Sequence, residues 1–95
     1  MTDLSPEHKG RCFRRLTVTG RVSRLNKATA HGICGLSLRL TVERAPRRTK
    51  VLRVCGDIWG SQIDKAEKIV NGSVVTLVGY LNGPIFDLEQ VLEVT

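Results

Sequence analysis

The stretch that decides the fold is WGSQIDKAEKIV, residues 59–70, because the hydrophobic period changes there. Its apolar residues recur at spacings of four, three and four: Trp59, Ile63, Ala66 and Val70, with Ile69 beside them. This spacing predicts an amphipathic helix across roughly residues 60–70. On both sides of it apolar and polar residues alternate, which is typical of strands with one buried face.

Three strands are predicted before the helix and two after it. They cover residues 15–25, 33–44, 50–56, 73–81 and 85–94. Residues 26–32 are predicted to be a polar loop, Gly20 to mark a bulge or sharp bend, and Asn82-Gly83 to form a tight hairpin. The resulting order β-β-β-α-β-β is that of an all-β, five-stranded oligonucleotide/oligosaccharide-binding barrel (OB-fold), whose helix bridges strands three and four.

A chain of 95 residues accommodates a single hydrophobic core. Residues 1–12 are polar and are predicted to be a flexible N-terminal arm, and residues 13–95 the OB-fold domain. The apolar runs are only a few residues long, and the N-terminus has no apolar signal region, so neither a membrane-spanning helix nor secretion is expected.

The cysteines Cys12, Cys34 and Cys55 are odd in number and widely spaced, which argues against a disulfide framework and favours a reducing, cytoplasmic compartment. Cys34 and Cys55 fall within the predicted strands and are expected to be small buried hydrophobic residues. The chain has no Cys-x-x-Cys pair, and His8 lies far from His31. Neither a metal site nor a cofactor is therefore expected.

Charge is divided unevenly along the chain. Residues 1–53 hold 13 Lys and Arg against 3 Asp and Glu, a balance of +10, whereas residues 54–95 hold 2 against 6, a balance of −4. The two halves sum to the formal net charge of +6. A basic half raises the expectation of a polyanionic partner such as nucleic acid, and a basic domain without such a partner is the alternative.

Several motifs resemble the bacterial single-stranded DNA-binding proteins. VTGRV (residues 18–22) resembles their first strand, and VCGD (residues 54–57) resembles their third. The Gly32 turn before Ile33–Leu40 resembles the approach to their second strand. The most specific motif is VNGSVVTLVGYL (residues 70–81), which resembles their fourth strand. The resemblance spans roughly residues 15–94, and the size is close to that of the short primosomal replication proteins of this family.

The resemblance implies a single-stranded DNA-binding accessory factor of replication or primosome assembly. It implies a cytoplasmic, nucleoid-associated homodimer or higher homo-oligomer, with other replication proteins as candidate partners. One departure is the turn at Asn82-Gly83, which is shorter than the hairpin with which family members grip nucleic acid.

Binding a single strand requires cations along the phosphates and flat side chains against the bases. The candidate phosphate contacts are Arg15, Arg21, Arg24, Lys27, Arg39, Arg47, Arg48, Lys50 and Arg53. Most of them fall on the open face of the second and third strands or in nearby loops, where OB barrels bind their ligands. Phe13 and Trp59 are the candidates for base stacking, and an apolar anchor for the helix is the alternative role of Trp59.

On the strand predicted at residues 73–81, Val74, Val78 and Tyr80 form an outward apolar stripe that one small barrel is not expected to bury alone. Self-association is the favoured explanation, and cover by the N-terminal arm is the alternative. Neither a nucleophile–base pair nor a Gly-rich phosphate loop is present, so catalysis is not expected. Two other functions stay open, namely RNA binding and a protein–protein interaction module that binds no nucleic acid.

Overall fold

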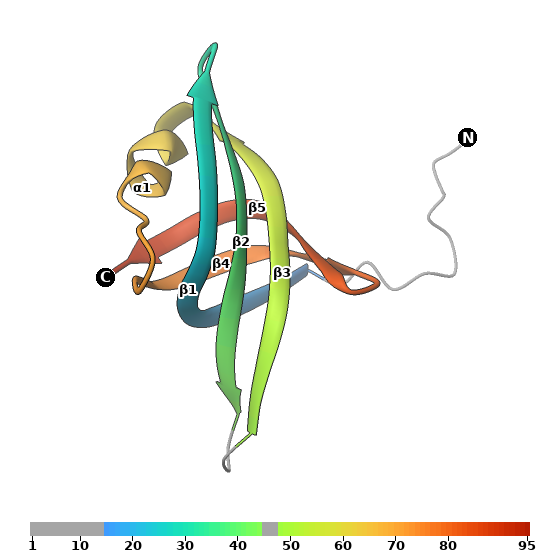
Figure 1. The fold of residues 1–95 in the computed structure, drawn as a ribbon. Helices are drawn as coiled ribbons and strands as arrows, with labels where there is room; N and C mark the ends of the chain where they lie inside the picture. Colours follow the sequence, from blue (N-terminus) through green and yellow to red (C-terminus); the bar gives the residue numbers. More distant parts are fainter. Residues whose placement is uncertain (1–14, 45–47) are drawn as a thin grey trace, which may run out of the picture.

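The computed structural model describes residues 15–44 and 48–95, which form a closed five-stranded barrel with one short helix (Figure 1). The strands are β1 (Arg15–Ala30), β2 (Ile33–Arg44), β3 (Arg48–Trp59), β4 (Val74–Asn82) and β5 (Ile85–Val94). A 3₁₀ turn (Gly60–Gln62) and helix α1 (Ile63–Glu67) connect β3 to β4. The order around the barrel is β1-β2-β3-β5-β4, and β4 pairs back to β1. Order and helix position confirm the predicted OB-fold.

Strand β1 closes the barrel because its two halves pair with different strands. Residues 15–21 pair with β4 and residues 21–30 pair with β2. At the change of partner, a Cβ added to Gly20 would lie 2.5 Å from the Thr41 carbonyl oxygen, so only glycine allows β2 to approach this closely. The β1–β2 register shifts a few residues later, around Arg24, whose φ is 54°.

Strands β1 and β3 are longer than predicted. Residues 26–30, predicted to be loop, pair with β2 as far as Ala30 opposite Ile33. The connection is therefore only His31-Gly32, whose φ values of 54° and 75° are those of a tight I′ hairpin turn. Strand β3 runs to Trp59 instead of ending at residue 56.

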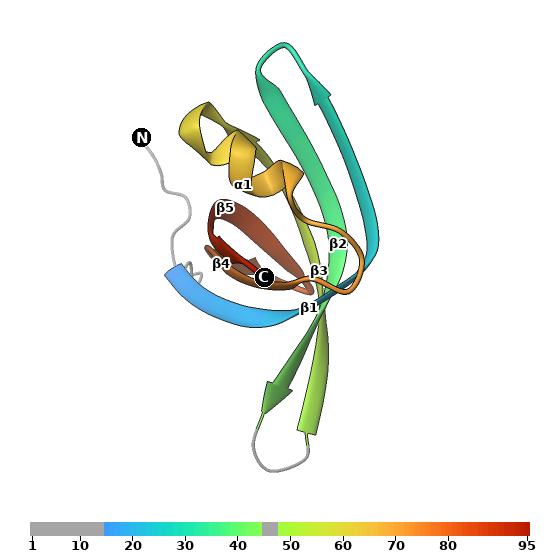
Figure 2. The same cartoon turned by 90° about the vertical axis from the view of Figure 1, so that its left-hand side faces the viewer.

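The helix is correspondingly shorter than predicted. It ends at Glu67 and lies beside β2 and β5 at one end of the barrel (Figure 2). Ala66 and Ile69 are fully buried, as the helical period predicts. Trp59 and Val70, in contrast, are 64% and 58% exposed, and both lie outside the helix. The prediction that these two residues belong to its buried face is wrong.

The core fills the barrel with the alternate residues of each strand. Its fully buried members include Cys34 and Leu40 of β2, Val54 and Ile58 of β3, Leu77 of β4, and Phe86 and Val91 of β5. Cys34 is a buried free thiol, and Cys55 is a half-buried free thiol. No helix in the described parts of the chain is long and apolar enough to cross a bilayer.

The β4–β5 hairpin turns one residue later than predicted. Asn82 still pairs with Ile85, so the turn residues are Gly83 and Pro84. Gly83 has a φ of 61°, and proline fixes its own φ near −65°, a combination that matches a type II′ turn.

Candidate nucleic-acid interface

The candidate interface is the outward side of β2 and β3 together with residues 21–30 of β1, here called the three-strand face. Figure 1 shows these strands side by side, with β4 and β5 crossing behind them. Alternation places every second residue of β2 and β3 on this face: Ile33, Gly35, Ser37, Arg39, Thr41, Glu43, Thr49, Val51, Arg53, Cys55, Asp57 and Trp59. Most of the intervening residues face the core.

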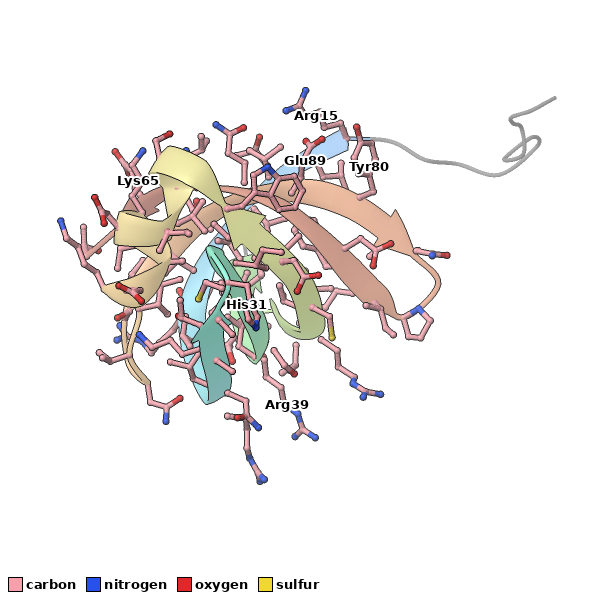
Figure 3. All side chains as sticks on the ribbon, turned by 90° about the horizontal axis from the view of Figure 1, so that it is seen from above. Arg15, His31, Arg39, Lys65, Tyr80 and Glu89 are labelled. Atoms are coloured by element: carbon pink, nitrogen blue, oxygen red, sulfur yellow. The ribbon has the colours of Figure 1, made fainter. Side chains whose placement is uncertain are left out.

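Three arginines gather on this face, and we call Arg24, Arg39 and Arg53 the arginine row. Arg39 and Arg53 are direct partners in the β2–β3 register, and all three side chains are exposed. They line one hollow of about 260 Å³. Figure 3 shows Arg39 pointing away from the barrel. Within residues 15–44 and 48–95 none of the three forms an ion pair, so their charges are available to an anion.

The backbone at Arg24 supports a functional interpretation of this row. Its positive φ is uncommon for a residue other than glycine and costs free energy. The β1–β2 register shift at this point changes the direction of the Arg24 side chain, so that it lines the same hollow as the two arginines of β2 and β3.

An exposed apolar pair lies at the other end of the three-strand face. Trp59 and Ile33 are register partners and are 64% and 42% exposed. An anchoring role for Trp59 in the core is therefore excluded, and its ring is open to a ligand. Trp59 follows Arg53 by six residues on β3, which corresponds to about 20 Å along a strand.

A shallow hollow of about 530 Å³, here called the central groove, lies between the arginine row and Trp59. Its lining residues include Asn26, Lys27, Ala28, Gly35, Ser37, Cys55, Asp57 and Asp87. Ser37 and Cys55 also line the arginine hollow, so the two hollows adjoin each other. The face thus combines cations at one end, an open aromatic ring at the other, and a groove between them.

Arg15 lies away from the three-strand face, whereas Lys27 is among the residues that line the central groove. Arg15 Nη2 is 2.9 Å from Glu89 Oε1, on the opposite side of the molecule from Arg39 (Figure 3). Lys27 Nζ donates hydrogen bonds to the carbonyl oxygens of Glu67 (2.6 Å) and Ile69 (2.9 Å) at the end of α1. Each cation therefore already has a partner within the fold.

Two further cations stand at the margins of the face. Arg21 is exposed beside Thr41, and its Nη1 donates a 2.9 Å hydrogen bond to the Gly72 carbonyl oxygen. Lys50 is exposed opposite Val42, on the other side of the β2–β3 hairpin from Arg39 by alternation. Phe13 and Arg47 lie outside the described residues, as does the side chain of Arg48.

The outward stripe predicted on β4 is mostly covered within one chain. Val78 is only 7% exposed, and Val74 and Tyr80 are half-buried. The β4–β5 register shifts on both sides of residues 77–78, and residues 77–79 are all buried. One chain therefore already covers Val78, so the expectation of an uncovered stripe is wrong for that residue. Self-association stays a prediction.

Sequence reasoning missed the central groove. Its signal is a pair of small residues in mid-strand, Ala28 and Gly35, which lie opposite each other on β1 and β2. Glycine in a strand often marks a place where a ligand approaches the backbone closely.

Among the described residues no group of three His, Cys, Asp or Glu side chains could hold a metal ion. No family model, curated protein or solved structure matches this chain.

Proposed function

We propose that this protein binds single-stranded DNA across the three-strand face. The observation that carries the proposal is the arrangement of this face, with the arginine row, the adjoining central groove and the exposed Trp59. Proteins that bind single strands combine cations for the phosphates with aromatic rings on which bases stack. A base within a duplex is already stacked on its neighbours, so an open ring favours an unpaired strand.

The phosphate contacts supply most of the affinity in this proposal. Aromatic residues make up only 4% of the chain, whereas Arg24, Arg39 and Arg53 converge on one hollow. Guanidinium groups bind phosphate oxygens through paired hydrogen bonds. Arg21, which stands beside the row, extends this track.

The choice of DNA and of a replication role comes from the sequence resemblance. The segment of residues 70–81 resembles the fourth strand of bacterial single-stranded DNA-binding proteins, and the chain is similar in size to primosomal replication protein PriB. We therefore propose an accessory factor of replication or primosome assembly. It would act in the cytoplasm with the nucleoid, as a self-associating protein alongside other replication proteins.

Fluorescence anisotropy with labelled single strands across a salt series tests the proposal. If about four to six phosphates are neutralised, log affinity falls with log salt with a slope of about −3 to −4. Matched DNA and RNA strands run in parallel, and tighter RNA binding would assign the protein to RNA instead. Absence of binding to both would leave the interaction module as the function of the barrel.

A further inference from the structure

Phosphate binding does not explain two carboxylates of the proposed interface. Asp57 of β3 and Asp87 of β5 both line the central groove, and both are exposed. In the part of the chain that the structure describes, neither forms an ion pair. Asp87 Oδ2 accepts a hydrogen bond of 3.4 Å from Asn82 Nδ2, which is long. Because carboxylates repel phosphates, the DNA backbone is not expected to enter this groove.

The backbone around Asp57 forms a flat floor beneath its carboxylate. Gly35 is the register partner of Asp57 on β2, and Ala28 is the partner of Gly35 on β1. A Cβ at position 35 would lie 3.3 Å from Asp57 Oδ1, so the carboxylate leans over the space that glycine leaves. The Asp57 carboxylate therefore lies above two neighbouring positions with little or no side chain, Gly35 and Ala28.

Trp59 lies next to this floor on the same face. It follows Asp57 by two residues on β3, a spacing of about 6.6 Å along a strand. A flat molecule that contacts Trp59 and rests on Gly35 and Ala28 has its edge beside the Asp57 carboxylate. A nucleobase is a flat molecule with hydrogen-bonding groups along its edge, so it fits this arrangement.

An ionised carboxylate accepts hydrogen bonds and donates none, so it distinguishes between base edges. The exocyclic amino group of cytosine is a donor that Asp accepts well. Uracil has a carbonyl oxygen at the same position, and its single N3–H donor is flanked by two oxygens that a carboxylate repels. We infer that the central groove reads base edges and selects amino-bearing bases, with Asp57 as the specificity-determining residue. This inference rests on the proposed binding of single strands.

The test compares oligodeoxycytidine and oligodeoxyuridine of equal length, which carry the same phosphates and differ at the base edge. We expect wild-type protein to bind the cytidine strand about tenfold more tightly, from one hydrogen bond to a charged acceptor. In Asp57→Asn the amide can donate as well as accept, so we expect the two affinities to become nearly equal. Asp64→Asn is the matched control, because it removes the same charge from an exposed position on α1 outside the groove.

The outcomes separate the inference from the proposed function. Equal wild-type affinity for the two strands would overturn base selection and leave single-strand binding intact. A preference that survives in Asp57→Asn, or that disappears equally in Asp64→Asn, would also overturn it. Absence of binding to either strand would overturn the proposed function itself. Circular dichroism confirms that each variant is folded, which we expect because both carboxylates are exposed.

Discussion

Arg39 and Arg53 lie directly opposite each other on neighbouring antiparallel strands, and both side chains are exposed on the outside of the barrel. Residues in this relationship have their Cβ atoms about 5 Å apart, and like charges there weaken the pairing of the strands. The exposed Arg24 lines the same hollow and adds a third positive charge. An anion bound between the arginines would relieve this repulsion, so binding of a ligand is expected to stabilise the sheet.

Replacing one member of the pair is therefore expected to weaken binding without loss of stability. In Arg53→Gln we expect lower affinity for single strands and a salt slope less steep by about 0.7, the value for one phosphate contact. The free energy of unfolding without ligand should be unchanged or higher by about 0.2–1 kcal/mol, because a like-charge contact is removed. Anisotropy in a salt series and urea unfolding measure the two effects.

Arg15→Gln is the control for this substitution. It also removes one exposed arginine, but from an ion pair with Glu89 on the opposite side of the molecule. We expect its salt slope to equal that of the wild type. If Arg15→Gln and Arg53→Gln reduce the slope equally, then the salt dependence of binding reflects the net charge of the protein, and the arginine row is not the phosphate-binding site.

Trp59 is expected to contribute to binding and little to stability. Its side chain is 64% exposed, and the loss of a stacked base costs about 1–3 kcal/mol of binding free energy. Trp59→Ala should therefore weaken binding by about tenfold or more, and Trp59→Phe by less. Trp59 is the only tryptophan in the chain, so its intrinsic fluorescence reports on this position alone. Fluorescence that does not change when a single strand binds would exclude stacking on this ring.

The sequence predicted the fold well because alternation survives in most of the strands. Cys34, Leu36, Leu38, Leu40 and Val42 alternate along β2; the first four are buried, and Val42 is half-buried. The fold class depended on a single change of period, and the structure confirms a helix there. The limits of that helix were harder to predict, because Trp59 and Val70 continue its spacing by coincidence while lying in a strand end and a connecting segment.

The site was less predictable, because a cation that faces outward need not be available to a ligand. Alternation alone does not distinguish Arg15, which pairs with Glu89, from Arg39, which lines the hollow. The grouping of the arginines depends on the β1–β2 register shift near Arg24 and on the β2–β3 register. Both are set by pairing between distant parts of the chain, and neither is visible in one strand's own sequence.

Two glycines on these strands are expected to respond differently to the same substitution. In Gly20→Ala the new Cβ would lie 2.5 Å from the Thr41 carbonyl oxygen, so β1 and β2 must separate where β1 changes partner. We expect a loss of about 1–3 kcal/mol in the free energy of unfolding, the usual cost of overpacking. In Gly35→Ala the nearest atom is Asp57 Oδ1 at 3.3 Å, on an exposed side chain that can move. Urea unfolding of the two variants side by side should show a large loss only for Gly20→Ala, and equal losses would contradict this account.

Lys27 is expected to act on stability instead of on binding, although the sequence assigns it to the phosphates. Its half-buried amine donates hydrogen bonds to the carbonyl oxygens of Glu67 and Ile69. Carbonyl groups at the end of a helix have no hydrogen-bond partner within the helix, so Lys27 supplies one. Lys27→Met keeps the length of the side chain and removes both bonds, so we expect the free energy of unfolding to fall by about 1.5–3 kcal/mol. The salt slope of single-strand binding should stay at its wild-type value, because no phosphate contact is lost.

Lys65→Met, on the exposed side of α1, removes the same charge and should leave stability nearly unchanged. A stable Lys27→Met protein with a shallower salt slope would show instead that Lys27 leaves the helix and binds phosphate.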